Sequence, residues 1–173
     1  RSRSSAAFGE PKFMGARLYL SSATPIRFAA ADDLALAGDG RGSGVAQTLL
    51  SVDSAPFAAT ASTIELPSEG EHVLSWFSRD LLGYAETVSS ASVAVDLTPP
   101  VSTATIGAPL FIAADAVRYV TPATPVALTV ADPVVSGVAS GLGRIEVSVD
   151  GAPFATYVST LTFAEGAHTL LYR

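Results

Sequence analysis

The stretch SVDGAPFATYVSTLTFAEGAHTL, residues 148–170, indicates an internal duplication, because its first part occurs twice in the chain. SVDGAPFA begins at Ser148, and a near copy, SVDSAPFA, begins at Ser51, which is 97 positions earlier (148 minus 51). Other segments match in the same order at nearly the same offset: SSAAFGEPKF (4–13) with STATIGAPLF (102–111), TPIRFAAAD (24–32) with TPVALTVAD (124–132), and EGEHVL (69–74) with EGAHTL (165–170). This pattern predicts a tandem duplication of one unit of about 95 residues, the size of a small β-sandwich.

Within each unit the apolar residues alternate with polar ones. In RIEVSVD, residues 144–150, the side chains of Ile145, Val147 and Val149 fall on one face of a strand and the polar side chains on the other. Turn signals such as Asp-Gly and Glu-Gly follow about every 8 to 12 residues, and no window holds a helical stripe. We therefore expect an all-β chain, with about seven short strands per unit arranged in two packed antiparallel sheets.

The repeated segment VDGAPF predicts a tight corner. Asp150 and Gly151 supply the two positive-φ positions of a hairpin turn, Pro153 stops further strand pairing, and Phe154 returns an aromatic side chain to the core. The first copy has Ser54 in place of the glycine. We expect this turn either to adopt another type or to hold Ser54 in a strained conformation.

Composition excludes several classes of protein. The chain is 49% hydrophobic and 15% charged, which is typical of a globular protein, and no apolar run is long enough to span a membrane. A net charge of -6 and a pI near 4.7 argue against nucleic-acid binding. The absence of cysteine excludes disulfides and thiol chemistry.

The start, RSRSSAAFGEPKF, lacks an initiator methionine and a signal peptide, so we expect an excised piece of a longer protein.

SVDGAPF followed by EGAHTLLYR resembles the immunoglobulin-like repeats of bacterial outer-surface and secreted proteins. In that family a Ser-x-Asp-Gly hairpin precedes a Glu-Gly-x-His-Thr strand, then a Tyr-Arg, an Asp and a Gly-Asn turn. The first copy keeps Asp80 and Gly83 but has Phe77 in place of the Arg and Tyr84 in place of the Asn. The resemblance implies a module strung in tandem on extracellular or cell-surface proteins, as a stalk or beside adhesive or polysaccharide-acting domains.

We therefore expect two tandem immunoglobulin-like antiparallel β-sandwiches, at residues 1–97 and 102–173, joined by a Pro-Pro linker at 98–101. The first copy closes with the strand-like TVSSASVAV (87–95), whereas the second halts at Tyr172-Arg173, so the second lacks its last strand. The open edge predicts pairing with a strand from the continuing natural chain, which we favour, or from an adjacent subunit by β-augmentation.

No residue pattern predicts catalysis or a bound cofactor. His72 and His168 occupy the same position in the two copies, just after the turn glycines Gly70 and Gly166, so we expect each imidazole to bond the neighbouring turn. The glycine-rich segment 38–44 fits neither a nucleophile elbow nor a dinucleotide fingerprint, and no helix follows it. We predict a protein that is not an enzyme.

Two binding hypotheses remain. Asp32, Asp33 and Asp39 could supply oxygen ligands to Ca²⁺, although their spacing matches no calcium loop and solvated carboxylates are the favoured interpretation. Surface aromatic residues could stack on a sugar ring, and the candidates are Trp76, Phe77, Tyr84, Tyr119 and Tyr157.

The main prediction is a structural or adhesive segment that contacts neighbouring repeats, a surface protein or a glycan. The alternative is a carbohydrate-binding accessory module of a secreted enzyme.

Overall fold

The computed structural model describes residues 2–32 and 42–173, and every regular element in them is a β-strand. The all-β prediction is confirmed. The chain divides into two compact units, which are described one at a time. Unit 1 comprises Arg1–Leu97 together with Val134–Ser140, and unit 2 comprises Thr98–Pro133 together with Gly141–Arg173.

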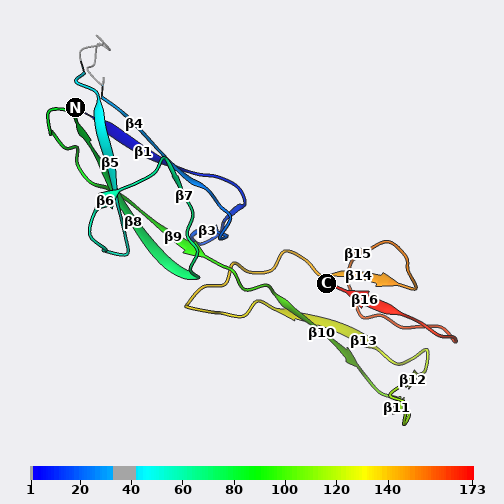
Figure 1. Ribbon diagram of the computed structural model, residues 1–173. Helices are drawn as coiled ribbons and strands as arrows, with labels where there is room; N and C mark the ends of the chain where they lie inside the picture. The colour runs from blue at the N-terminus through cyan, green and yellow to red at the C-terminus, as the bar shows by residue number, and fades with distance from the viewer. Residues whose placement is uncertain (1, 33–41) are drawn as a thin grey trace. The chain divides into compact units, whose positions relative to one another are not determined.

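Unit 1 contains two sheets (Figure 1). The smaller sheet has the strand order β1-β4-β7, and the larger has the order β2-β3-β9-β8-β5-β6. The bounds are β1 Arg3–Phe8, β2 Lys12–Met14, β3 Leu18–Leu20, β4 Ile26–Ala31, β5 Val45–Val52, β6 Ala58–Ala59, β7 Thr63–Ile64, β8 Gly70–Asp80 and β9 Ser89–Val95.

The sequence predicted purely antiparallel sheets, but the larger sheet also contains one parallel pair of strands. β9 pairs antiparallel with β8 over seven residues, from Gly70↔Val95 to Trp76↔Ser89, and parallel with β3 through Tyr19↔Ala94 and Leu20↔Val95. A parallel pair needs a long connection, and here most of unit 1 lies between the two strands in sequence. β9 is therefore an interior strand with ladders on both sides.

The core of unit 1 lies between the two sheets, which makes the unit sandwich-like. Alternate residues of β4, β8 and β9 meet there, because successive side chains of a strand point to opposite faces. Phe28 of β4 makes an edge contact with Trp76 of β8, with ring centroids 5.8 Å apart. Val93 and Val95 of β9 are almost completely buried in the same cluster. Burial of these side chains is the main source of stability for the unit.

Unit 2 contains three small sheets: β10-β13, β11-β12 and β15-β14-β16. The bounds are β10 Val101–Ile106, β11 Leu110–Ile112, β12 Arg118–Val120, β13 Val126–Ala131, β14 Glu146–Val149, β15 Ala155–Thr156 and β16 Leu170–Tyr172. The β10–β13 ladder has the same length and form as the β1–β4 ladder, with six antiparallel pairs in each. In unit 1, β9 joins the hairpin β2–β3 to β8, but the described residues of unit 2 hold no such strand between β12 and β16.

The observed units differ from the expected ones in two segments. Residues 98–101, which were expected to form a Pro-Pro linker, belong to unit 2, and Val101 begins β10. Residues 134–140 belong to unit 1, where the backbone N of Ser140 donates to Asp96 Oδ2 at 2.6 Å. Alternation of apolar residues cannot predict this placement, because the segment contains only an isolated bridge, Val135↔Val138. None of the described segments forms a helix long and apolar enough to cross a membrane.

Candidate functional site

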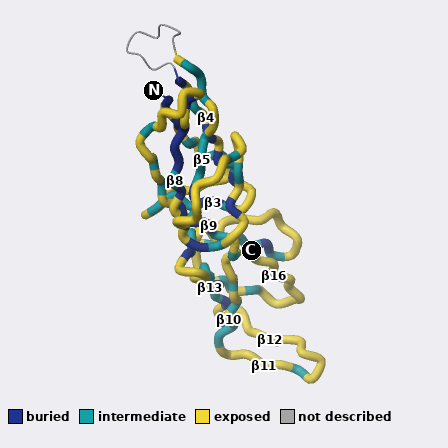
Figure 2. The backbone as a smooth tube through the Cα atoms, turned by 60° about the vertical axis from the view of Figure 1, so that its left-hand side comes forward, coloured by how far each residue is buried: buried dark blue, intermediate teal, exposed yellow. Residues whose placement is uncertain are grey.

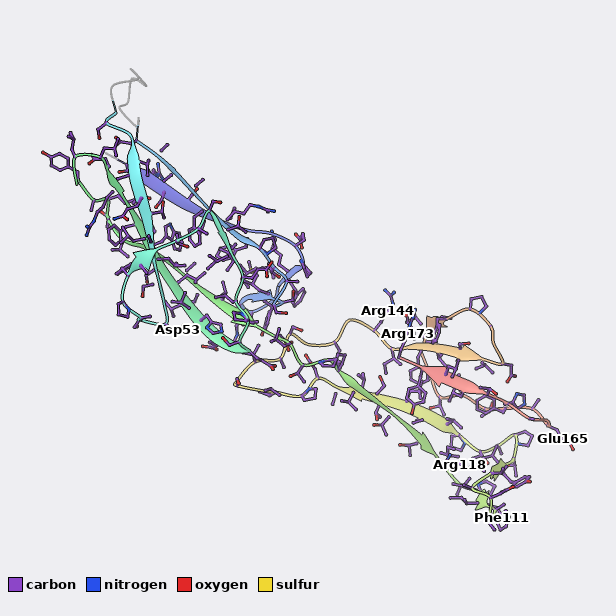
Figure 3. All side chains as sticks on the ribbon, in the orientation of Figure 1. Asp53, Phe111, Arg118, Arg144, Glu165 and Arg173 are labelled. Carbon is purple, nitrogen blue, oxygen red and sulfur yellow. The ribbon has the colours of Figure 1, made fainter. Side chains whose placement is uncertain are left out.

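An aspartate–histidine corner joins β5 to β8 in unit 1 (Figure 3). Asp53 Oδ2 lies 2.7 Å from His72 Nδ1, and Asp53 Oδ1 accepts the backbone N–H of Val73 at 2.8 Å. The other ring nitrogen, Nε2, donates to the carbonyl of Ser68 at 2.9 Å. Both ring nitrogens therefore face acceptors, an arrangement that only the protonated imidazole satisfies completely.

The ionisation of His72 follows from this geometry. Burial disfavours the charged imidazole, but the hydrogen bonds to Asp53 and to the Ser68 carbonyl outweigh it and raise the pKa of His72 above its ordinary value. Burial also acts to raise the pKa of Asp53, but the bonds from His72 and from the Val73 N–H lower it overall. The pair is held as an ion pair that ties a turn to a strand.

The same corner occurs in unit 2. His168 Nδ1 lies 2.8 Å from Asp150 Oδ2, and its Nε2 lies 3.1 Å from the carbonyl of Ala164. Asp150 Oδ1 accepts the backbone N–H of Thr169 at 2.8 Å. The bond to Asp150, followed by that to Ala164, raises the pKa of His168. The His168 side chain is 26% exposed, against 9% for His72.

The turns beneath the two histidines share one backbone conformation. Asp150 and Gly151 have φ values of 52° and 77°, and the first unit has 51° at Asp53 and 64° at Ser54. Each turn is closed by one bond, from Ala152 N to the Val149 carbonyl and from Ala55 N to the Val52 carbonyl, both at 3.0 Å. Two positive φ values identify a type I′ turn. Of the two expected outcomes, the chain therefore keeps the turn type and holds Ser54 in the left-handed region.

The remaining predicted turn residues lie at the ends of strands. Pro153 lies between β14 and β15, where no ladder bond requires its missing N–H. Gly70 and Gly166 have φ values of 138° and 142°, a region open to glycine alone, and each stands two residues before a corner histidine.

The calcium hypothesis falls partly outside the described residues, since these do not include Asp33 and Asp39. Asp32 is buried, and its Oδ2 accepts the backbone N–H of Gly44 at 2.9 Å and the hydroxyl of Ser43 at 3.2 Å. Asp132, its counterpart in unit 2, accepts the N–H of Gly141 at 2.6 Å. Both carboxylates are loop-bracing groups. Over residues 2–32 and 42–173, no cluster of three potential metal ligands is present.

The five aromatic candidates do not form one platform. Trp76 and Phe77 are buried, and the Tyr157 hydroxyl accepts the backbone N–H of Leu128 at 3.2 Å. Tyr84 and Tyr119 are exposed but belong to different units.

The structure adds two aromatic pairs that the sequence reasoning missed. Phe13 and Tyr19 stack across the β2–β3 hairpin with centroids 6.1 Å apart, and Phe111 and Tyr119 pair across β11–β12 at 6.2 Å. Direct cross-strand pairing places each couple on one face. Their recurrence at matched positions in the two copies was the available sequence signal.

A cavity of about 950 Å³ lies in unit 2 between β12 and the segment that leads into β16. Its apolar wall includes Ile106, Val120, Val126, Phe163 and Leu170, and Arg118, Glu165 and His168 supply polar groups (Figure 3). In Figure 2 the strands β11 and β12 are mostly yellow, for exposed, whereas β8 of unit 1 is largely dark blue, for buried.

Ion pairs hold β16, which contributes Leu170 to the cavity wall, against its neighbour β14. Glu146 of β14 pairs with Arg173 and with Arg144, each at 2.9 Å (Figure 3). The hydrogen bonds from these two guanidinium groups lower the pKa of Glu146. These ion pairs hold β16 in register on β14. The other edge of β16 lies on the side away from β14.

Comparisons of the chain with protein-family models, curated proteins and solved structures find no match. What the chain does must therefore be inferred from its own residues.

Proposed function

We propose that the chain is a pair of tandem immunoglobulin-like units that forms a non-catalytic structural or adhesive segment of a larger extracellular bacterial surface or secreted protein. Its role would be that of a stalk, spacer or fibre component. The observation that carries this proposal is the aspartate–histidine corner, repeated in the two units. In each corner both carboxylate oxygens and both imidazole nitrogens bond to the corner itself, so these groups have a structural use and not a catalytic one.

Further contacts recur at matched positions and support the tandem repeat. Gly9 N donates to the Pro25 carbonyl at 2.8 Å, and Gly107 N donates to the Pro125 carbonyl at the same distance. The Thr24 hydroxyl bonds the carbonyl of Pro11, as the Thr124 hydroxyl bonds that of Pro109. Interactions of this kind hold loops against sheets and specify a stable module.

Force spectroscopy on the chain, pulled from its two ends, tests the structural role. β9 has ladder bonds on both sides, so unit 1 should resist force and then open in one event. About 95 residues at ~3.3–3.6 Å each span roughly 310–340 Å when fully extended, so that event should lengthen the chain by this amount less the end-to-end distance of the folded unit. Smooth extension with no discrete event for unit 1 would contradict a spacer that withstands mechanical force.

Glycan binding is the second candidate, and the exposed aromatic pairs favour it. Phe111 and Tyr119 are 66% and 58% exposed, and such rings can stack on the apolar face of a sugar. A glycan-array experiment with the chain and with Phe111→Ala tests this function. Binding that the substitution removes would support an accessory module, whereas an array without signal would oppose it.

A further inference from the structure

The β2–β3 hairpin of unit 1 carries two aromatic rings on its outer face. Phe13 and Tyr19 are direct cross-strand partners, and their rings are stacked at an interplanar angle of 29°. Side chains alternate along a strand, and Leu20 points into the core, so the neighbouring Tyr19 lies on the opposite face of the sheet. Phe13 is 54% exposed. The two rings form an apolar surface that we call the β2–β3 platform.

The platform is held in place by its surroundings. A Cβ at Gly15 would lie 2.9 Å from Phe13 Cε1 and 3.4 Å from Tyr19 Cε2, so a larger residue in the hairpin would displace the rings. On the other face of β3, Leu18 and Leu20 pack in the core of the unit. A surface that is already ordered loses little conformational freedom when it binds a ligand.

An ion pair stands beside the platform. Arg17 pairs with Glu71 of β8, and its guanidinium carbon lies 5.8 Å from the centroid of the Tyr19 ring. Ala94 of β9 pairs with Tyr19 on one side and with Glu71 on the other. One row of side chains, which begins at Phe13, therefore crosses the four strands β2, β3, β9 and β8. The Arg17 and Glu71 side chains are 39% and 64% exposed, so a ligand on this face can reach them.

The second copy keeps the rings but not the charges. It has the pair Phe111 and Tyr119, with Val117 and Ala167 in place of the two charged residues. Cross-strand contact of the rings alone would stabilise a hairpin in either unit. Only unit 1 combines the aromatic pair with a donor and an acceptor in the same row.

These groups match the chemistry of a neutral sugar. The C–H face of a pyranose ring packs on an aromatic ring, while its hydroxyl groups need hydrogen-bond donors and acceptors. Glu71 offsets the charge of Arg17, and the chain has a net charge of -6, so the site does not favour an acidic sugar.

The length of the row sets the size of the ligand. From Phe13 to Glu71 it spans three inter-strand spacings of about 4.8 Å, or roughly 14 Å. A single sugar ring is too small to contact both ends, and a coiled chain would leave the row. An extended oligosaccharide fits it.

We propose that the β2–β3 platform, together with Arg17 and Glu71, binds a neutral, extended glycan of the β-1,4-linked glucose type. Phe13 stacks on one sugar ring. Further along the glycan, Arg17 donates to a hydroxyl oxygen and Glu71 accepts from a hydroxyl group. The site rests on the second candidate function, glycan binding, and goes beyond the spacer role.

The probe is cellohexaose, a soluble chain of six β-1,4-linked glucose units, added to the complete, isotopically labelled 173-residue chain and followed by NMR. We expect saturable shifts of the amide signals along the row: Phe13, Arg17, Tyr19, Glu71 and Ala94. Maltohexaose, which coils, and a hexamer of galacturonic acid, which is acidic, should each bind at least about tenfold more weakly.

Variants locate the contacts. Phe13→Ala removes the most exposed ring of the row from an edge strand and should weaken cellohexaose binding by at least about tenfold. Arg17→Met keeps much of the apolar stem but removes the donors, and it should weaken binding about fivefold. Tyr84→Ala is the control, because Tyr84 is 66% exposed in unit 1 but lies outside the row, so the affinity should not change.

The outcomes separate this site from the broader function. Shifts outside the row, unchanged affinity in Phe13→Ala, or preference for the acidic hexamer would overturn the site; the shift map of the unmodified chain decides if that variant does not fold. Glycan binding that Phe111→Ala removes and Phe13→Ala leaves intact would also overturn it, but would keep the glycan-binding function. A chain that binds neither cellohexaose nor any glycan on the array would overturn both.

Discussion

Truncating one leucine in each unit should have unequal effects. Leu74 is completely buried in the core of unit 1, on a strand paired on both sides. Replacing a buried leucine by alanine costs about 2–5 kcal/mol, from lost burial and from the cavity that remains. For Leu74→Ala we expect about 3 kcal/mol, because β5 and β9 on either side prevent collapse. In a unit of this size that lowers the Tm by roughly 12–24 °C, at about 4–8 °C per kcal/mol.

Leu170 is the matched residue of unit 2 and borders an open cavity. Its truncation should cost only about 1 kcal/mol, because the side chain is partly exposed before the change.

The assay exploits the single tryptophan of the chain. Trp76 lies in the core of unit 1 against Phe28, so its fluorescence follows the unfolding of that unit alone. Amide exchange in β14 and β16 follows unit 2. If Leu170→Ala destabilised unit 2 as much as Leu74→Ala destabilises unit 1, the difference in burial would not set the cost and the reasoning would be wrong.

Three further predictions concern unit 1 and are measured by Trp76 fluorescence. Ser54→Gly should stabilise it by about 1 kcal/mol, because glycine adopts the φ of 64° without strain, and a lower Tm would contradict the turn assignment. The wild-type advantage in unfolding free energy over Asp53→Asn should be largest between pH 3.8 and 6.5, the ordinary pKa values of the two groups. It should fall as the pH rises through the raised pKa of His72 or drops through the lowered pKa of Asp53, and a pH-independent difference would exclude the ion pair. Gly9→Ala should cost about 1–3 kcal/mol, because the new methyl would lie 2.7 Å from a proline ring carbon, and a neutral effect would show that the loop relaxes.

Much of the fold could be predicted because it is written in short-range patterns. Alternation of apolar residues shows that a segment is a strand and which face is buried, and an Asp-Gly pair identifies the turn at Asp150. Neither pattern specifies which strands become neighbours. The parallel pairing of β3 with β9 joins residues about 75 positions apart (94 minus 19), and it depends on how the sheets close around the core.

The candidate sites were less predictable for the same reason. The histidines were recognisable as turn residues from their position after Glu-Gly, but their aspartate partners lie 18 and 19 residues away, each in the turn that follows another strand. The residues that line the cavity of unit 2 could be assigned only from the structure, because they come from four segments of the unit. Phe77 is buried against Phe57, with ring centroids 5.0 Å apart, a contact that local sequence does not encode.

The protonation of the two corner histidines tests the repeated structural corner. NMR of the isotopically labelled chain should follow both ring nitrogens of His72 and His168 as the pH rises. Because the hydrogen bonds in each corner outweigh burial, both imidazoles should have a pKa above the ordinary value of 6.5. A pKa at or below that value for either histidine would rule out an ion pair repeated in the two units.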